Sequence, residues 1–176
     1  MKRKAVFLDR DGVLNQAVMK EGKPCSPDSL DAVIIPEDAC SSLQALKQAS
    51  FLLIGATNQP DVVRGVTTRA MVESINRKLL SVLPLDAMRV CYHDDRDQCD
   101  CRKPLPGLLI QAAHDYDIDL KHSYMIGDRW RDIAAGKQAG CKTIWLDYHY
   151  QEVFLSESPD FTATSLTEAV KWIIGT

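Results

Sequence analysis

Long apolar runs are missing from this 176-residue sequence, and their absence argues against two classes of protein. Behind the basic start, the apolar run extends only from Ala5 to Leu8 before Asp9 ends it. A secretory signal needs roughly 7–15 apolar residues in its central part, and a membrane-spanning helix needs about 20. We therefore expect neither export nor membrane contact, and predict a cytoplasmic protein.

The sequence also lacks an excess of basic residues, an internal repeat and any low-complexity segment. It carries 21 Lys and Arg against 24 Asp and Glu, a net charge of −3, so nothing predicts binding to nucleic acid. A chain of 176 residues fits one domain, 1–176, that buries a full core. Long apolar surface stripes are absent too, which favours a monomer.

Apolar runs typical of buried strands alternate with segments of helical periodicity. The expected strands are 4–9, 51–54, 87–92, 123–126 and 142–146, and the expected helices are 36–50, 67–83, 105–116, 129–139 and 166–174. Residues 15–35 are rich in Gly, Pro, Ser and Asp and predict a long loop. The alternation is typical of an α/β fold with three layers, a Rossmann-like parallel sheet with helices on both faces. The connecting segments leave no room for a separate cap domain.

Polar side chains follow several of the expected strands. Asp9, Thr57, His93 and Asp128 come after four of them, and ligands of parallel sheets bind at the carboxyl ends of the strands. Taken singly, the acids after the first strand fit a polar turn, and Asp128 fits the N-cap of the following helix. Taken together, they indicate a functional edge of the sheet.

Three carboxylates gathered at neighbouring strand ends repel one another in a partly buried site. A hard divalent cation removes this repulsion, and Mg²⁺ prefers one or two carboxylates together with waters and a phosphate oxygen. Such a metal also neutralises the charge of an incoming phosphate. The sequence therefore predicts a magnesium site formed by Asp9, Asp11 and Asp128.

The same residues supply what phosphoryl transfer requires. Asp9 leaves a rigid strand and can act as the nucleophile that forms an aspartyl-phosphate. Asp11, two residues on, can protonate the leaving alkoxide and later activate water. A phosphate is bound by neutral donors and a cation. The candidates for these are Thr57, Asn58, Lys103 and its neighbour Arg102.

Four segments resemble, in order, the motifs of the haloacid dehalogenase superfamily of phosphatases. They are Asp9-Arg-Asp-Gly-Val13, Thr57-Asn58-Gln59, Arg102-Lys103-Pro104 and Gly127-Asp128-Arg129. The resemblance implies that Asp9 is the nucleophile and Asp11 the general acid and base, and that Thr57 and Lys103 bind the phosphoryl group. It also implies that Mg²⁺ is held by Asp9, the backbone carbonyl of Asp11, and Asp128. Asp132 either supports this metal from behind its ligands or is an exposed helix residue.

Three cysteines and a histidine are concentrated in the short segment 91–101. Cys91, His93, Cys99 and Cys101 form a ligand set typical of a tetrahedral structural zinc site. The loop has few apolar residues to hold it otherwise, although free thiols beside a surface histidine remain the alternative. Because Arg102 and Lys103 follow the last ligand directly, a zinc-fixed loop would position the phosphate-binding lysine. The other three cysteines, Cys25, Cys40 and Cys141, are interpreted as ordinary small residues.

This zinc segment resembles one branch of the superfamily, which contains heptose-bisphosphate phosphatases and histidinol phosphatases. Residues 57–65 and 101–107 are similar to the heptose enzymes, the short spacing from His93 to Cys99 is more similar to the histidinol enzymes, and Tyr92 stands where both usually have proline. The resemblance implies a small phosphorylated sugar as substrate, D-glycero-D-manno-heptose 1,7-bisphosphate cleaved at its 7-phosphate. Histidinol phosphate or another small phosphorylated metabolite is the alternative.

Without a cap, substrate selection falls to the loops at the sheet edge. Arg64 and Arg69 can meet a second phosphate, or they can be the solvated start of a helix. Two further hypotheses compete with a phosphatase: a phosphotransferase or mutase on the same scaffold, and a zinc-binding interaction module without enzymatic activity. A mutase normally needs a cap to exclude water, and an interaction module does not require the acids and Lys103 together.

Overall fold

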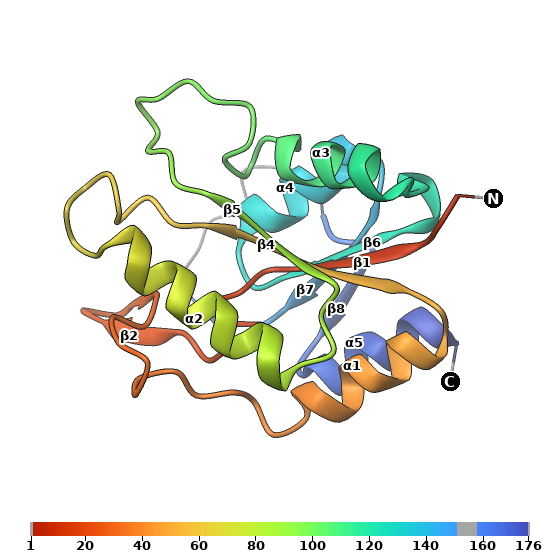
Figure 1. Cartoon of the computed structure of the whole chain (residues 1–176). Helices are drawn as coiled ribbons and strands as arrows, with labels where there is room; N and C mark the ends of the chain where they lie inside the picture. Colours follow the sequence, from red (N-terminus) through yellow and green to blue (C-terminus); the bar gives the residue numbers. More distant parts are fainter. Residues whose placement is uncertain (1, 151–157, 176) are drawn as a thin grey trace.

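A computed structural model describes residues 2–150 and 158–175 of the chain (Figure 1). Its centre is a parallel sheet of six strands in the order β5-β4-β1-β6-β7-β8. The strands are β1 (Ala5–Leu8), β4 (Leu52–Asn58), β5 (Ala87–Cys91), β6 (Tyr124–Gly127), β7 (Lys142–Leu146) and β8 (Phe161–Ala163). Numbered along the chain, these strands follow the doubly wound order 3-2-1-4-5-6. The chain therefore reverses its direction of growth beside β1, between β1 and β6.

Helices cover both faces of the sheet. On one face, α1 (Ala39–Gln48), α2 (Arg69–Val82) and α5 (Leu166–Ile174) pack on a core that includes Val6 and Leu8 of β1. On the other face, α3 (Gly107–Tyr116) and α4 (Trp130–Ala139) lie over Phe7 of β1 and Met125 of β6. All four residues of β1 are fully buried, as expected of a strand covered on both sides. The predicted three-layer α/β fold is confirmed.

Local sequence signals explain where several helices begin and end. Thr68 is the N-cap of α2 and accepts a hydrogen bond from the backbone N–H of Met71 (3.1 Å), and Ser165 caps α5 in the same way. Gly140 ends α4 with a φ of 85°, a left-handed conformation that glycine adopts without strain. Among the helices that the structure describes, none combines the length and the apolar character that a bilayer crossing requires.

The expected loop at 15–35 is wrong in part, because it contains a small antiparallel hairpin. Strands β2 (Val18–Lys20) and β3 (Lys23–Cys25) pair across a two-residue turn. Glu21 and Gly22 in this turn both have positive φ, 49° and 75°, the geometry of the tight hairpin turn that matches the strand twist. The strands are mostly exposed, so no apolar alternation announces them in the sequence.

Two strands of the sheet also differ from the expected elements. The strand expected at 51–54 is longer, and Thr57 and Asn58 are the last residues of β4 rather than part of the loop behind it. Strand β8 was missed, because three residues paired only with β7 give too short a pattern to detect. The sheet accordingly has six strands instead of five.

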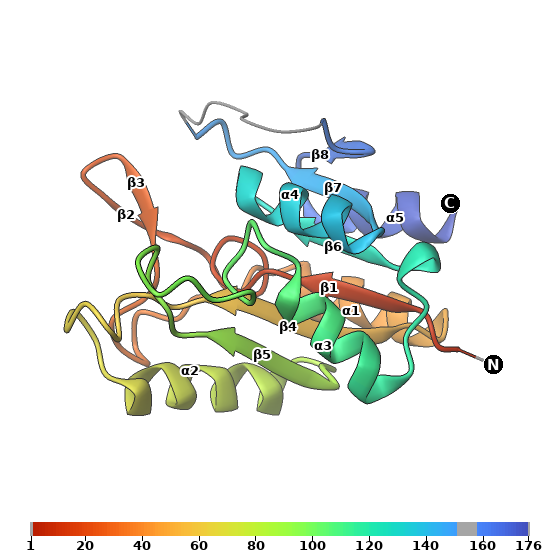
Figure 2. The same cartoon turned by 90° about the horizontal axis from the view of Figure 1, so that it is seen from above.

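The connecting loops at the carboxyl ends of the strands gather at one end of the molecule. Figures 1 and 2 show the hairpin β2–β3, the loop that leads into α2 and the loop that follows β5 at this end, with both termini at the other. The prediction that the chain has no cap domain stays a prediction. The end that gathers these loops is where the candidate residues lie.

Candidate active site and metal centres

The candidate site begins at Asp9, the residue that follows β1. Its backbone N–H donates to the carbonyl of Ile126 on β6 (3.0 Å), which continues the sheet pairing by one residue. Its Oδ1 accepts from the backbone N–H of Arg10 (2.8 Å) and from Nζ of Lys103 (2.8 Å). The carboxylate is therefore fixed at the point where the strand order reverses.

Lys103 is buried and reaches Asp9 from the loop before α3. Its Nζ also donates to Oδ1 of Asp132 (2.6 Å) and to the carbonyl of Ala56 (2.6 Å). The side chain of Asn58 fixes the lysine backbone from both sides: Oδ1 accepts from the Lys103 N–H (3.0 Å), and Nδ2 donates to its carbonyl (2.9 Å). Asn58 thus holds Lys103 in place, while its expected contact with a phosphate stays a prediction.

Three carboxylates converge at this point. Asp9, Asp128 and Asp132 each offer an oxygen within 4.8 Å of the others. Within the part of the chain that the structure describes, both buried oxygens of Asp128 lack a hydrogen-bond partner. A Cβ at Gly12, where φ is 99°, would lie only 2.0 Å from Oδ2 of Asp128, so glycine is required for this close approach. Buried carboxylate oxygens without donors fit a cation.

The electrostatics of the cluster support the same interpretation. Burial, together with the charge of Asp132, raises the pKa of Asp9 to about 7. Burial and the charge of Asp9 raise the pKa of Asp128 well above its ordinary value. Burial acts to lower the pKa of Lys103, but Asp132 and Asp9 outweigh it and the pKa is raised. The raised pKa values of Asp9 and Asp128 show that their ionised forms are disfavoured here, and a divalent cation can stabilise those forms.

Asp11 lies beside this cluster and is surrounded by donors. Its Oδ1 accepts from Nε of Arg10 (3.1 Å) and Nδ2 of Asn15 (3.0 Å). Its Oδ2 accepts from NH2 of Arg10 (3.0 Å), Oγ of Ser26 (2.7 Å) and Nε2 of Gln59 (2.8 Å). Burial acts to raise the pKa of Asp11, but the guanidinium of Arg10 and these hydrogen bonds lower it. Asp11 is thus held as an ionised acceptor.

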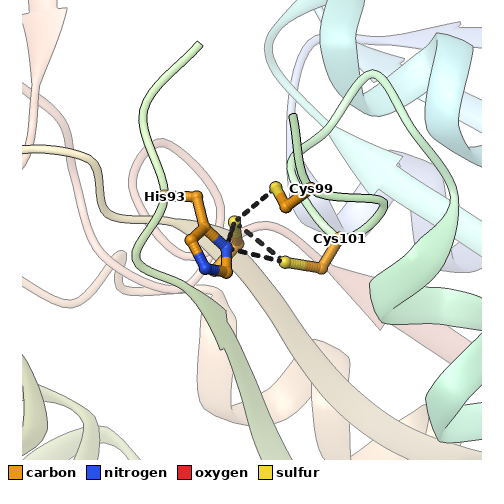
Figure 3. A group of neighbouring side chains, drawn as sticks. His93, Cys99 and Cys101 are labelled. Carbon is orange, nitrogen blue, oxygen red and sulfur yellow. Dashed lines mark hydrogen bonds between the residues drawn. The ribbon is translucent and has the colours of Figure 1, made fainter. Parts of the chain in front are cut away.

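The cysteines and the histidine predicted to bind zinc come together at the end of β5, which contributes Cys91, and in the loop behind it (Figure 3). The Sγ atoms of Cys91 and Cys99 are 3.8 Å apart, and Nδ1 of His93 lies 3.6 Å from Sγ of Cys91 and 3.3 Å from Sγ of Cys101. A tetrahedron with Zn–S bonds of about 2.3 Å has sulfur–sulfur edges of about 3.8 Å. The 3.1 Å between Cys101 and Cys91 is tighter than such an edge. The four side chains therefore surround a space close to the size that zinc needs.

Arg64 and Arg102 are both expected to contact substrate. Both are paired with acids of the loop that follows β5, residues 92–101, called the cysteine loop below. Nε of Arg64 donates to Oδ2 of Asp94 (2.7 Å), and its NH1 lies 3.5 Å from Oδ1 of Asp61. Nε of Arg102 donates to Oδ1 of Asp95 (2.8 Å). Each arginine would meet an anion only in competition with a carboxylate that it already contacts.

Some residues of the site were not anticipated, and one alternative can be decided. Asp132 is buried and bound to Lys103, so it is not an exposed helix residue. Arg10 and Asn76, both buried, form a contact with each other and were missed. A polar Asn76 among the apolar positions of the expected helix 67–83 was the one available signal. Arg69, the other candidate for a second phosphate, pairs with Glu73 instead.

Comparisons with known proteins agree with this geometry. The family model described as HAD-hydrolase-like matches residues 100–169. A D-glycero-beta-D-manno-heptose-1,7-bisphosphate 7-phosphatase of Bordetella bronchiseptica is 40% identical over 154 residues, which cover 81% of this chain and 79% of that protein. A D-glycero-D-manno-heptose-1,7-bisphosphate 7-phosphatase of Thermosynechococcus vestitus is 33% identical, covering 98% and 96% of the two chains.

A solved structure extends the similarity to the whole fold. The crystal structure of a D,D-heptose 1,7-bisphosphate phosphatase from B. bronchiseptica, complexed with magnesium and phosphate, superposes with a TM-score of 0.83 at 30% identity. The match covers 98% of this chain and 98% of that one. The similarity therefore includes the strand ends at which the carboxylates converge.

Proposed function

This chain belongs to the haloacid-dehalogenase-like phosphatase family that includes the heptose-bisphosphate 7-phosphatases, and on that premise we propose that it removes the 7-phosphate from D-glycero-D-manno-heptose 1,7-bisphosphate. The observation that carries the proposal is the position of Asp9. Its carboxylate lies at the strand-order reversal, bonded to buried Lys103 and beside the buried carboxylate of Asp128. The proposed substrate is inferred from the relatives described above, which are named as heptose-bisphosphate phosphatases. Their names favour the heptose ester over histidinol phosphate.

In the proposed reaction, a carboxylate oxygen of Asp9 forms a bond to phosphorus while the bond to the sugar oxygen breaks. Asp11 gives a proton to that departing oxygen and then takes one from the water that cleaves the aspartyl-phosphate. Its ionised state here, with five hydrogen bonds to the carboxylate, corresponds to the base form of the second step. Lys103 and the hydroxyl of Thr57 neutralise and orient the phosphoryl oxygens.

Magnesium is the proposed cofactor of this step. Its ligands are the carboxylates of Asp9 and Asp128 and the backbone carbonyl of Asp11, and Asp132 holds Lys103 next to them. The metal supplies charge neutralisation and Lewis-acid polarisation of a phosphoryl oxygen. Support comes from the Asp128 oxygens, which lack a hydrogen-bond partner among the described residues, and from the magnesium in the B. bronchiseptica structure.

Zinc is the second proposed metal, in a structural role. Cys91, His93, Cys99 and Cys101 hold it, and Lys103 follows the last ligand by two residues. Burial raises the pKa of the Cys91 thiol, so metal binding displaces a proton there. Arg64, anchored to this loop through Asp94, is the proposed contact for the distal phosphate, and Arg102, bonded to Asp95, is the proposed cation beside Lys103. We further propose that residues 1–176 form one domain and that it acts as a monomer without a cap.

The direct test is phosphate release by the purified protein from the heptose 1,7-bisphosphate. We expect magnesium-dependent release of one phosphate per molecule, with the 1-phosphate as the other product, and loss of release on chelation. Histidinol phosphate and hexose phosphates serve as competing substrates at equal concentration. A higher kcat/KM for histidinol phosphate would overturn the substrate proposal, and no release from any ester would overturn the phosphatase.

A further inference from the structure

Arg10 occupies an unusual position between the two catalytic carboxylates. Asp9 and Asp11 lie at the carboxyl end of the central strand β1, whereas the side chain of Arg10, between them in the sequence, has no solvent exposure at all. Its Nε and NH2 donate to the two oxygens of Asp11 (3.1 and 3.0 Å), a side-on, bidentate pairing. Burial of a guanidinium is costly unless its donors are satisfied, so the remaining nitrogen needs a partner as well.

Asn76 provides that partner from a distant part of the chain. It lies on α2, on the face that also buries Val72, Ile75 and Leu79. Its Oδ1 accepts from NH1 of Arg10 at 3.1 Å, although the two residues are 66 positions apart. Arg10 thus bridges the middle of a helix and the carboxylate of Asp11, with both ends inside the protein.

We propose that Arg10 and Asn76 are positioning residues that orient the carboxylate of Asp11 for proton transfer to the leaving oxygen. The inference rests on the proposed phosphatase function and deepens it. A planar fork that bonds both oxygens of Asp11 fixes the plane of the carboxylate, which a point charge such as lysine cannot do. Asn76 holds the opposite end of the guanidinium. The orientation of Asp11 is therefore fixed by a packed helix, α2, rather than by the loop that carries Asp11.

The other contacts of Asp11 do not replace this anchor. Ser26 follows strand β3 of the exposed hairpin, and Asn15 precedes strand β2. Gln59 lies just beyond β4 and divides its amide group between Asp11 and the hydroxyl of Thr57. Within this set, the guanidinium is the one donor that contacts both oxygens at once. Loss of the contact between Arg10 and Asn76 is therefore expected to change the orientation of the Asp11 carboxylate while leaving the carboxylate in the site.

Proton transfer to the leaving oxygen gives the proposal a distinctive consequence. A sugar alkoxide is a poor leaving group, and its release needs the proton that Asp11 delivers as the P–O bond breaks. p-Nitrophenolate leaves as a stable anion and needs no proton. A misaligned Asp11 will therefore slow phosphoryl transfer from the sugar ester and leave transfer from the aryl ester nearly unchanged. A general loss of fold or of metal binding would slow both.

The experiment compares kcat/KM on these two esters for wild type, Asn76→Leu and Arg10→Lys, with magnesium present. Asn76→Leu removes only the acceptor, and Arg10→Lys keeps the charge but loses the fork. For each variant we expect a loss of roughly ten- to a hundredfold on the sugar ester, a part of what a positioned acid contributes, and less than about threefold on p-nitrophenyl phosphate. Leu79→Ala, a large-to-small change on the same buried face of α2, controls for destabilisation.

The outcomes separate this inference from the proposed function. Equal losses on both esters in Asn76→Leu, with KM and kcat changed as in Leu79→Ala, would show a purely structural role and overturn the inference. An unchanged sugar-ester rate in a folded Asn76→Leu would do the same. If wild type hydrolyses neither ester while Asp9→Asn behaves identically, the proposed function itself is wrong. Circular dichroism of every variant establishes that it is folded.

Discussion

The two candidate metal centres of this protein are joined through Lys103, which follows the last cysteine by two residues and contacts Asp9 and Asp132, but they are built in opposite ways. The carboxylate cluster of Asp9, Asp128 and Asp132 stands at the ends of strands and the start of a helix, buried and already in place. The Cys–His cluster begins at Cys91, the last residue of β5, and continues on a loop whose remaining residues are polar and mostly exposed, although Asp94 is half-buried. The first is held by the strands and helices of the fold, whereas the second lies largely on a loop that is held by the ion pairs of Arg64 and Arg102.

The two centres also differ in what a metal would supply. Among the carboxylates the geometry exists without a metal, and the unfavourable feature is like charge in a buried place. Protonated thiols carry no charge, so like-charge repulsion does not disturb the Cys–His centre. What a metal adds there is a set of bonds that keeps the loop in one conformation. A metal therefore contributes charge balance at the first centre and folding free energy at the second.

Removal of the nucleophile breaks the carboxylate centre chemically and gives the largest expected effect. Asp9→Asn keeps the shape of the side chain but leaves a poor nucleophile, so we expect kcat to fall on the order of a thousandfold or more. Steady-state phosphate release measures this loss. Asp117→Asn, at an exposed αL position where asparagine is accepted, is the control. Retention of a tenth of wild-type turnover by Asp9→Asn would contradict the aspartyl-phosphate mechanism.

Replacement of a zinc ligand tests the other half of the comparison. Cys101→Ser is expected to reduce zinc from one ion per chain to well below that, since serine is a weak ligand. It is also expected to loosen Lys103 and lower activity by roughly ten- to a hundredfold. Elemental analysis and kinetics on the same preparation measure both changes. Cys40→Ser, an exposed thiol outside the cluster, serves as the control. Wild-type protein free of zinc, with the three thiols of Cys91, Cys99 and Cys101 all reactive, would refute the zinc site.

How far these centres could be anticipated from the sequence depends on the range of the interactions. Strands β1, β5 and β7 form from local apolar runs, the zinc ligands stand at short spacings, and Asp9 and Asp128 each follow a strand directly. The hairpin β2–β3 and strand β8 are three-residue strands whose pairing, not composition, defines them. The contact of Arg10 with Asn76 joins residues 66 positions apart. Such contacts follow from tertiary packing, which a local pattern does not contain.

Arg64 sharpens the comparison because it links the loop after β4 to the cysteine loop. If it meets the distal phosphate, Arg64→Ala is expected to lower kcat/KM for the heptose 1,7-bisphosphate by about tenfold, the lower end for a charged hydrogen bond, because Asp94 competes for the guanidinium. The 7-monophosphate is expected to lose much less. Arg69→Ala, whose arginine pairs with Glu73, is the control. Equal losses on both substrates would remove the distal-phosphate role.

The last prediction concerns stability, which the loss of one ligand is expected to raise at the metal-free carboxylate centre and to lower at the zinc-loaded Cys–His centre. Asp128→Asn removes one of the crowded buried charges and keeps the shape, so the metal-free variant is expected to be more stable than wild type, whereas Cys101→Ser lowers the stability of the zinc-loaded protein. The size of the Asp128→Asn gain depends on pH. The pKa of Asp128 is raised well above its ordinary value, mainly by burial and by Asp9, whose own pKa is raised to about 7.

The sign of the pH effect follows from proton binding. A carboxyl group with a raised pKa keeps in the folded state a proton that the unfolded chain releases above about pH 4, so the stability of metal-free wild type falls as the pH rises from there toward 7. The Asn variant lacks the Asp128 part of this fall. We therefore expect it to exceed wild type by more than about 1 kcal/mol in unfolding free energy at pH 8, since each pKa unit is worth about 1.4 kcal/mol, and by little at about pH 3.5, where Asp128 is mostly protonated in both states. Denaturant unfolding in the presence of a chelator measures the difference, with Asp117→Asn as the control expected to follow wild type at both pH values.

Magnesium at pH 8 is expected to reverse the order of stability, because it stabilises the protein that binds it more tightly. A variant less stable than wild type at both pH values without metal would mean that the carboxylate cluster is not electrostatically strained.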